Sequence, residues 1–156
     1  MNSEPAANSE SLPVYRPKSR FSGGVFIFPI RVFYEDTDAA GIVYYANYLK
    51  FMERARTEML RGVGLNHRDL LNEHKLVFVV RRCLLEYLAA ARLDDFIEIQ
   101  TKVLCVKGAS LDIEQIVCHR KKILVESKLT LACVGELGAP RRLPPDLRAK
   151  LNDLLV

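Results

Sequence analysis

Residues 34–48, YEDTDAAGIVYYANY, contain the side chains of this chain that are best suited to chemistry. Three carboxylates, Glu35, Asp36 and Asp38, precede a turn of small residues that ends at Gly41, and aromatic residues then lead toward a predicted helix. An aspartate is ionised at neutral pH, so it can act as a nucleophile or as a base. The N–H groups at a helix start are unpaired and carry positive partial charge, so they favour nearby negative charge. The motif is therefore a candidate site for nucleophilic or acid–base chemistry.

The aspartate before the glycine turn also has a structural explanation. In a turn before a helix, an aspartate more often caps the helix or closes an Asx turn than it catalyses a reaction. The motif by itself leaves the structural and the catalytic roles of Asp38 open.

The chain has the length and composition of one soluble domain. Its 156 residues are 49% hydrophobic, which is enough to bury a core. The 23 Lys and Arg residues against 19 Asp and Glu give a net charge of +4, far from the dense positive charge of a nucleic-acid-binding domain, so we expect no nucleic-acid partner. The chain has no basic start followed by an apolar segment, and no later apolar run is long enough to span a membrane. We therefore expect a soluble, cytoplasmic protein without an integral membrane segment.

The spacing of cysteines and histidines argues against a metal site. The four cysteines have no CxxC spacing and no histidine at ligand intervals, so we predict reduced cysteines in strands, with no zinc, no disulfide framework and no cofactor. The three histidines are isolated from the motif and are predicted to be surface residues. These seven residues are Cys83, Cys105, Cys118, Cys133, His67, His74 and His119.

The composition divides the chain into an arm and one domain. Residues 1–24 are rich in Ser, Pro, Asn and Ala and poor in large apolar residues, which predicts a disordered N-terminal arm. The domain spans residues 25–156. It begins with a predicted strand at 25–35, in which Pro29 indicates an edge position or a bulge.

A long amphipathic helix is predicted over residues 47–61. Asn47 can be its N-cap, and Gly62 and Gly64 can end it. A shorter helix is predicted at residues 66–73. The residues predicted to face the core are Tyr48, Phe51, Met52, Ala55 and Met59, and those predicted to point elsewhere are Lys50, Glu53, Arg54, Arg56 and Glu58.

Four long strands are predicted after the helices, at residues 76–88, 94–108, 109–121 and 122–136. The breaks between them are too short for parallel crossovers, so neighbouring strands are predicted to be antiparallel. A C-terminal helix is predicted with Pro145 in its first turn. This order indicates an α+β fold in which a five-stranded antiparallel sheet carries the long helix on one face. Because the other face is partly apolar, we expect the chain to pair with another copy, at least as a homodimer.

The sequence resembles a known family through the segments YEDTDAAGIVYYANYLKFMERARTEML, FVVRRCLLEYLAAARLDDFIEIQT and RRLP. These segments are similar to the hotdog-fold acyl-CoA thioesterases of the 4-hydroxybenzoyl-CoA thioesterase family, and within it to the YbgC-type branch associated with the Tol-Pal system. The resemblance covers about residues 26–145. It implies the hotdog fold, a curved antiparallel sheet wrapped around a long central helix, and hydrolysis of an acyl-CoA thioester to a free acid and CoA.

The resemblance implies roles for individual residues of the motif. Asp38 corresponds to the family's catalytic carboxylate, as nucleophile or general base, which leaves Glu35 and Asp36 as structural or solvated charges. The N–H of Tyr45 corresponds to the main oxyanion donor, and Gly41 lets the backbone fold closely enough to present it. No metal is required for this chemistry.

Substrate-binding residues are implied by two further segments. The hairpin VKGAS contributes to the CoA surface in the family, so Lys107, Gly108 and Ser110 are expected near the phosphates of CoA. The basic residues 120–122 are the second candidate, and charged hairpin tips taken alone are usually only solvated. Tyr44 is followed by Tyr45 where many YbgC-type chains have a histidine, so the acyl preference of that branch does not transfer to this chain. Two roles remain open for both tyrosines: they could line the acyl pocket, or they could simply pack against neighbouring residues.

Other assignments stay open at this point. Glu53 or Glu58 could be the catalytic carboxylate, since some hotdog thioesterases use a glutamate on the central helix, but each is expected to pair with a neighbouring arginine. A hotdog dehydratase acting on acyl carrier protein substrates would need a histidine beside the carboxylate, and the motif has none. The alternative function is a non-catalytic module that binds acyl thioesters or acyl carrier protein in envelope lipid metabolism. The expected partners are the acyl-CoA substrate, acyl carrier protein as an alternative, and further copies of the chain in a homodimer or homotetramer.

Overall fold

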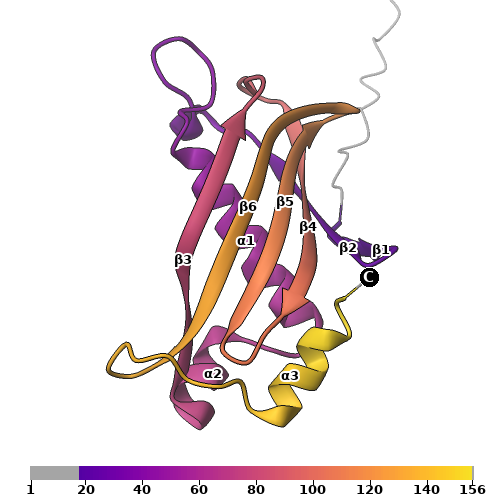
Figure 1. Cartoon of the computed structure of the whole chain (residues 1–156). Helices are drawn as coiled ribbons and strands as arrows, with labels where there is room; N and C mark the ends of the chain where they lie inside the picture. The colour runs from indigo at the N-terminus through magenta and orange to yellow at the C-terminus, as the bar shows by residue number, and fades with distance from the viewer. Residues whose placement is uncertain (1–17, 156) are drawn as a thin grey trace, which may run out of the picture.

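The computed structural model describes residues 18–155 of the chain (Figure 1). Its elements in chain order are β1 (Arg20–Ser22), β2 (Val25–Arg31), the 3-10 turn η1 (Tyr34–Asp36), α1 (Asn47–Gly62), α2 (His67–His74), β3 (Leu76–Tyr87), β4 (Phe96–Val106), β5 (Ser110–His119), β6 (Lys122–Gly135) and α3 (Pro145–Asn152). Most of the predicted disordered arm, residues 1–24, lies outside the described residues, and β1 falls within its last part.

One antiparallel sheet forms the body of the domain. Its six strands follow the order β1-β2-β4-β5-β6-β3, and all neighbouring strands are antiparallel. The predicted α+β class is confirmed, but the sheet has six strands instead of five because Arg20–Ser22 add β1 beside β2. β1 pairs only with Val25–Ile27, whereas β4 pairs with the whole of β2. At Pro29, β2 therefore has a neighbouring strand on one side only, which is the predicted edge position.

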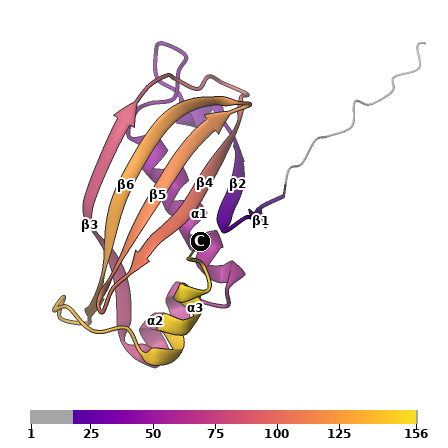
Figure 2. The same ribbon diagram turned by 45° about the vertical axis from the view of Figure 1, so that its right-hand side comes forward.

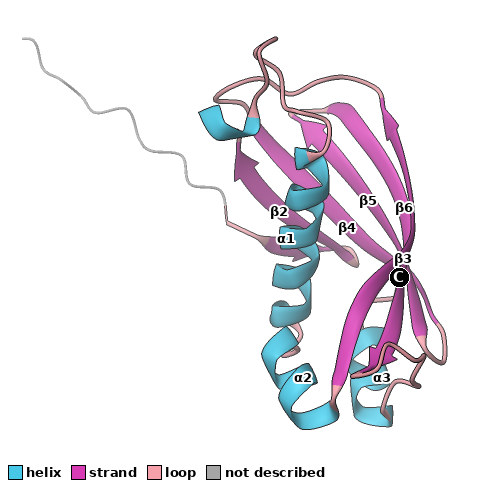
Figure 3. Cartoon of the chain, turned by 90° about the vertical axis from the view of Figure 1, so that its left-hand side faces the viewer, coloured by secondary structure: helices cyan, strands magenta, loops and turns pink. Residues whose placement is uncertain are grey.

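The sheet curves around α1, which lies along one of its faces (Figure 3). The predicted apolar stripe faces the sheet: Phe51, Met52 and Ala55 have no exposed surface, and Tyr48 and Met59 are almost fully buried. Burial of each large side chain contributes about 1.5–3 kcal/mol, so this contact is a major contribution to the stability of the domain. The helices α2 and α3 close one end of the domain, and the loop before α1 lies at the other end (Figure 2).

The start of α1 differs from the prediction. Asn47 is the first helical residue, and Ala46 is the N-cap. The Asn47 side chain donates a hydrogen bond to the backbone carbonyl of Asp36 at 2.9 Å. The asparagine therefore ties the helix to the preceding loop, a role that depends on tertiary structure and not on the local capping pattern.

Arg56 also differs from the prediction, because it is half-buried between α1 and the sheet. It donates to Oε1 of the fully buried Gln115 at 2.8 Å, and burial lowers the pKa of Arg56. The Gln115 side-chain nitrogen donates to the Met52 carbonyl at 3.0 Å and to the Thr101 hydroxyl at 2.9 Å. This network joins the helix to the middle of the sheet through polar contacts.

The sheet face away from α1, turned toward the reader in Figure 1, combines charged and apolar side chains. Lys102, Glu114 and Lys128 lie in register on β4, β5 and β6, while Leu84 on β3 is exposed. The partly apolar outer face is thus as predicted, with a charged centre. The cysteines lie in β3, β4, β5 and β6 as free thiols, so their predicted location in strands is confirmed.

Candidate active site

Asp38 lies in a tight turn between η1 and α1. Its backbone N–H donates to the Ile42 carbonyl at 2.9 Å, and the Gly41 N–H donates to the Asp38 carbonyl at 3.0 Å. Gly41 has a φ of +73°, a left-handed conformation that costs a residue with a side chain about 1–2 kcal/mol. The turn itself therefore requires the glycine of the motif.

The Asp38 carboxylate has one engaged oxygen and one open oxygen. Oδ1 accepts a hydrogen bond from the Ala40 N–H at 2.8 Å, which forms an Asx turn. Within residues 18–155, no donor is bonded to Oδ2, and the side chain is exposed. A hollow of about 450 Å³ adjoins it, lined by Tyr34, Thr37, Asp38, Ala39, Gly41 and Leu93. The structural role and a catalytic role are compatible, because they use different oxygens of the same carboxylate.

The backbone at the start of α1 presents a free donor at Tyr45. The Tyr44 N–H donates to the Asp36 carbonyl at 2.9 Å, and the Asn47 N–H donates to the Tyr44 carbonyl at 2.8 Å. For the Tyr45 N–H, the described part of the chain provides no acceptor. This is the condition that an oxyanion donor must meet, because its N–H has to be available to a ligand.

Asp36 holds the loop that carries Asp38. It is 8% exposed, and its Oδ2 accepts a hydrogen bond from the Phe33 N–H at 2.8 Å across η1. Its backbone carbonyl accepts from the Tyr44 N–H and from the Asn47 side chain. The interpretation of Asp36 as a structural charge therefore agrees with its contacts, and Glu35 is exposed to solvent.

Residues 91–95 support the turn from the side of the sheet. The Val43 N–H donates to the Ala91 carbonyl at 2.9 Å, and the Ala91 N–H donates to the Tyr48 hydroxyl oxygen at 2.9 Å. Burial raises the pKa of Tyr48, which keeps the hydroxyl neutral. One tyrosine of α1 thus connects the helix to the segment that supports the loop.

The Tyr48→Phe variant is expected to lower the free energy of unfolding by about 1–3 kcal/mol, because it leaves the buried Ala91 N–H without an acceptor. The matched control is Tyr34→Phe, since the Tyr34 side chain is 83% exposed. Urea denaturation of the two variants and the wild type measures the difference. Equal stability of all three proteins would contradict a supporting role for the Tyr48 hydroxyl.

Tyr87, at the end of β3, contacts the same region and was not singled out in the sequence. Its hydroxyl donates to the Tyr45 carbonyl at 3.0 Å, and its ring centroid lies 6.1 Å from that of Tyr45 and 5.8 Å from that of Tyr48. The rings of Tyr44 and Tyr45 lie 4.9 Å apart, and both side chains are exposed. The alternation of β3, which turns Tyr87 toward α1, was the signal in the sequence that could have identified it.

The hairpin with Lys107, Gly108 and Ser110 lies at the opposite end of the sheet from Asp38 (Figures 1 and 2). It follows β4, whereas the segment that supports the Asp38 turn precedes β4, and this strand of 11 residues spans about 34 Å. Lys107 forms an ion pair with Asp112, in which Nζ lies 2.7 Å from Oδ2. A single copy of the chain therefore does not bring these three residues to Asp38.

The turn between β5 and β6, which contains the basic residues 120–122, lies at the same end as Asp38. His119, directly before it, is partly buried and is not the simple surface residue that was predicted. Its Nδ1 lies 2.8 Å from the Phe96 carbonyl oxygen, and its Nε2 lies 3.8 Å from Oδ1 of Asp95. The histidine thus lies against Asp95 and Phe96 and outside the lining of the Asp38 hollow.

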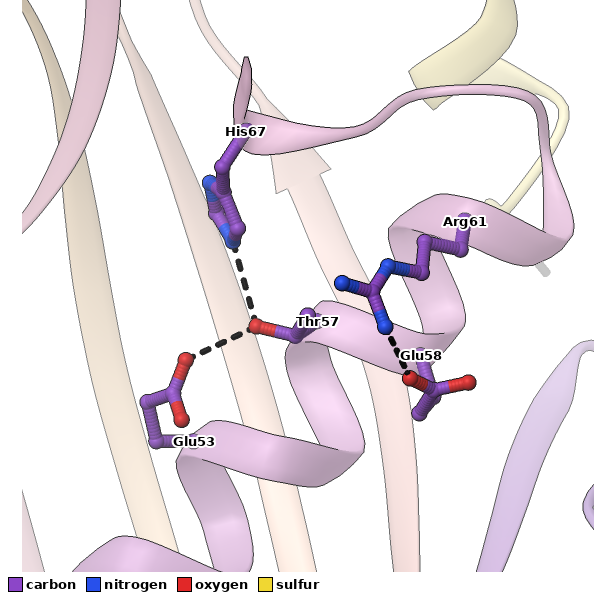
Figure 4. Close-up of polar contacts among 5 residues, drawn as sticks. All are labelled: Glu53, Thr57, Glu58, Arg61 and His67. Carbon is purple, nitrogen blue, oxygen red and sulfur yellow. Dashed lines mark hydrogen bonds and ion pairs between the residues drawn. The ribbon is translucent and has the colours of Figure 1, made fainter.

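The two glutamates of α1 have partners within the helices (Figure 4). Glu58 pairs with Arg61 at 2.6 Å, as expected for a neighbouring arginine. Glu53 accepts a hydrogen bond from the Thr57 hydroxyl at 2.7 Å, and its negative charge acts on the neighbouring Arg56, whose pKa it raises against the lowering effect of burial. The same hydroxyl lies 3.1 Å from Nε2 of His67. Neither glutamate lines the Asp38 hollow.

Comparison with known proteins shows the family of the chain. Residues 32–151 match the family model of the thioesterase-like superfamily. The chain belongs to this superfamily. It is 44% identical over 131 residues to "Acyl-CoA thioesterase YbgC" of Haemophilus influenzae, covering 83% of this chain and 96% of that protein. It is 46% identical over 130 residues to "Acyl-CoA thioester hydrolase YbgC" of Escherichia coli O6:H1, covering 82% of this chain and 96% of that protein.

Solved structures of the superfamily have the same fold. A probable thioesterase from Bartonella henselae is 38% identical, has a TM-score of 0.75, and is covered over 99% of its length by 77% of this chain. The resemblance to YbgC-type hotdog thioesterases is thus confirmed, as are the hotdog fold and the enzyme class of thioester hydrolases. Among the helices of residues 18–155, none has the length and hydropathy needed to cross a bilayer.

Proposed function

We propose that this chain hydrolyses acyl-CoA thioesters, with Asp38 as the nucleophile or general base and the Tyr45 N–H as the oxyanion donor. The names of the two YbgC relatives support the substrate class. The residue assignment rests on one observation: the same loop contains one acceptor atom and one donor group that have no hydrogen-bond partner. Within residues 18–155, both Oδ2 of Asp38 and the N–H of Tyr45 lack a hydrogen-bond partner.

These groups are sufficient for the reaction in chemical terms. The thioester oxygen accepts a hydrogen bond from Tyr45, which stabilises the negative charge that develops as the carbonyl is attacked. In the general-base route, Asp38 takes a proton from water, the hydroxide adds to the carbonyl carbon, and the C–S bond breaks as CoA leaves as a thiolate that is then protonated. In the nucleophilic route, Asp38 itself adds to the carbonyl carbon, and the C–S bond breaks to release the CoA thiolate, which is then protonated, and to leave an anhydride between Asp38 and the acyl group. Water then hydrolyses this anhydride to the free acid and the Asp38 carboxylate.

The proposed site is completed by a second copy of the chain. β3 is the last strand of the sheet, so its outer edge has unpaired backbone groups, and its side chains Val79, Val80 and Leu84 are exposed. Antiparallel pairing of this edge with β3 of another copy reverses the direction of the second sheet. The hairpin of the second copy, with Lys107 and Ser110, then lies toward the Asp38 end of the first. This arrangement brings Lys107 and Ser110 of one copy toward Asp38 of the other, although the two groups lie far apart within a single copy.

A screen of the purified chain against short, long and aromatic acyl-CoAs tests the proposed function. Thiol release is followed colorimetrically, and acyl carrier protein carrying the same acyl groups is assayed in parallel. We expect release from at least one acyl-CoA class. Binding of acyl-CoA without release from any substrate would contradict the proposal and favour a non-catalytic acyl-thioester binding module.

The Tyr87→Phe variant tests how the oxyanion donor is held. Loss of the hydrogen bond to the Tyr45 carbonyl is expected to lower kcat up to about tenfold with little change in KM, because the phenylalanine ring keeps the packing but does not hold the peptide. Thr57→Val is the matched control, since it removes a hydroxyl from a distant part of α1. A kcat equal to that of the wild type, or an equal fall in the control, would argue against a positioning role for Tyr87.

A further inference from the structure

Asn47 contacts both segments that carry the proposed catalytic groups. Its backbone N–H donates to the Tyr44 carbonyl at 2.8 Å, and its side-chain nitrogen donates to the Asp36 carbonyl at 2.9 Å. The first contact lies within the turn that contains Tyr45. The second contact reaches back 11 residues along the chain, to the segment that leads to Asp38. One residue thus links the two sides of the proposed site.

The backbone contact of Asn47 fixes the direction of the proposed oxyanion donor. The Tyr44 carbonyl and the Tyr45 N–H belong to the same peptide group, and none of the peptide bonds in residues 18–155 is cis. In a trans peptide, the carbonyl and the N–H point in opposite directions. Because the Tyr44 carbonyl points to the Asn47 N–H, the Tyr45 N–H points away from α1. The donor therefore keeps its direction only while the first turn of α1 keeps its place.

The side-chain contact of Asn47 holds the start of α1 against the segment that leads to Asp38. The Asp36 carbonyl accepts two hydrogen bonds, one from the Tyr44 N–H at 2.9 Å and one from the Asn47 side chain. Asp36 is almost fully buried and its carboxylate is bonded to the Phe33 N–H, so this carbonyl lies in a fixed part of the loop. Asp38 follows shortly after it in the chain. A shift of α1 against this carbonyl would therefore change the separation of the oxyanion donor from the carboxylate.

This contact is not the usual one for an asparagine at a helix start. Asparagine is favoured at the N-cap, where its side chain accepts hydrogen bonds from the first turn. In α1 the N-cap is Ala46, which makes no side-chain cap, and Asn47 donates to a distant segment instead. In α2, Asn66 is the N-cap, and its Oδ1 accepts from the Asp69 N–H at 2.9 Å. The helix beside the proposed site thus departs from the local rule that the shorter helix follows, as is typical of functional sites.

We propose that Asn47 is a positioning residue, which holds the Tyr45 N–H and the Asp38 carboxylate at the separation that thioester hydrolysis requires. The inference rests on the proposed function. Asn47 acts through other groups, because its side-chain nitrogen is bonded to the Asp36 carbonyl. Without this side chain, the first turn of α1 is free to shift against the loop. A displacement of about 1 Å in a catalytic arrangement lowers the rate by up to about 10²-fold.

The Asn47→Ala variant tests this role in the full chain. It should fold, because alanine is favourable in a helix and the Asp36 carbonyl keeps its hydrogen bond from the Tyr44 N–H. We expect kcat for acyl-CoA to fall by about 10- to 100-fold and KM to change by less than about twofold, because the tie affects the reacting groups and not the rest of the substrate. Asn47→Leu, which keeps most of the side-chain volume, should show the same fall. A wild-type kcat in either variant would overturn the inference.

Asn66→Ala is the matched control, because it also removes an asparagine hydrogen bond from a helix start. The start of α2 lies at the end of the domain opposite to the loop before α1 (Figure 2). The control should lower the midpoint temperature of unfolding by about 2–4 °C and leave kcat unchanged. An equal fall of kcat in Asn66→Ala and Asn47→Ala would assign the effect to lower stability and overturn the inference.

A double variant separates positioning from a general disturbance of the fold. Residues that act as a unit have non-additive effects on the rate. In a protein that already carries Asp38→Asn, the further change Asn47→Ala should lower kcat by less than about twofold, because no carboxylate is left to position. A further fall as large as that in the wild-type background would show that Asn47 acts independently of Asp38, which would overturn the inference.

Amide relaxation measured by NMR separates this inference from the proposed function. The order parameter of the Tyr45 N–H should be about 0.85 in the wild type and in Asn66→Ala, and below about 0.6 in Asn47→Ala. Such a fall in a protein whose wild type releases no thiol from any acyl-CoA would support the positioning of the N–H by Asn47 and reject the thioesterase proposal. Thiol release by the wild type, with the same kcat and the same order parameter in Asn47→Ala, would retain the enzyme and reject the role of Asn47.

Discussion

The Asp38→Asn protein is expected to fold normally and to release thiol from acyl-CoA about 10²–10⁴-fold more slowly than the wild type. The fold should be retained because the asparagine side-chain oxygen can still accept the hydrogen bond from the Ala40 N–H and close the turn. The rate should fall because a neutral amide neither attacks a carbonyl carbon nor takes a proton from water. The measurement is kcat for thiol release, with circular dichroism as the check on folding.

Glu35→Gln is the matched control for Asp38→Asn. It removes one negative charge from the same motif, at an exposed side chain outside the lining of the hollow. Its kcat should stay close to that of the wild type. This result would show that a change in local charge alone does not cause the fall in kcat of Asp38→Asn. Thiol release by Asp38→Asn at the wild-type rate would remove Asp38 from the mechanism. An equal loss in both variants would assign the effect to the charge of the loop.

The Phe51→Ala protein is expected to lose about 3–5 kcal/mol of unfolding free energy. Phe51 is fully buried between α1 and the sheet, and its ring packs edge-on against that of Tyr48 with centroids 6.0 Å apart. Removal of the ring takes away its burial energy and leaves a cavity that the neighbouring residues fill only in part. Urea denaturation monitored by circular dichroism measures the difference.

Leu49→Ala provides the control for Phe51→Ala, because Leu49 lies on the same helix and is 45% exposed. Its substitution should change the unfolding free energy by no more than about 0.5 kcal/mol. Since Tyr48 supports the segment beside the Asp38 turn, the Phe51 variant should also lose activity at a lower temperature than the wild type. Similar stability of the two variants would contradict the assignment of Phe51 to the core.

The elements predicted correctly are those whose signals are local in sequence. The apolar spacing of Tyr48, Phe51, Met52, Ala55 and Met59 predicted the buried face of α1, because residues three and four apart share one side of a helix whatever the rest of the chain does. Pro145 marked the start of α3, and the short breaks between the last strands required antiparallel neighbours. The Asp38 turn with its glycine was equally local, since φ at Gly41 is a property of one residue.

The remaining features depended on contacts between distant segments. Asn47 binds the Asp36 carbonyl instead of capping α1, and Arg56 is held inward by Gln115 across 59 residues. The family resemblance predicted that Lys107 and Asp38 bind the same substrate. Within one copy, however, the two residues lie at opposite ends of the sheet, about the length of β4 apart. The register shift at Arg81 follows from how β3 pairs with β6, which no single segment encodes. The sequence determined the elements and the residues of the motif, because local spacing controls both. Only the tertiary structure decided which charges stay unpaired, because pairing requires partners that folding brings together from far along the chain.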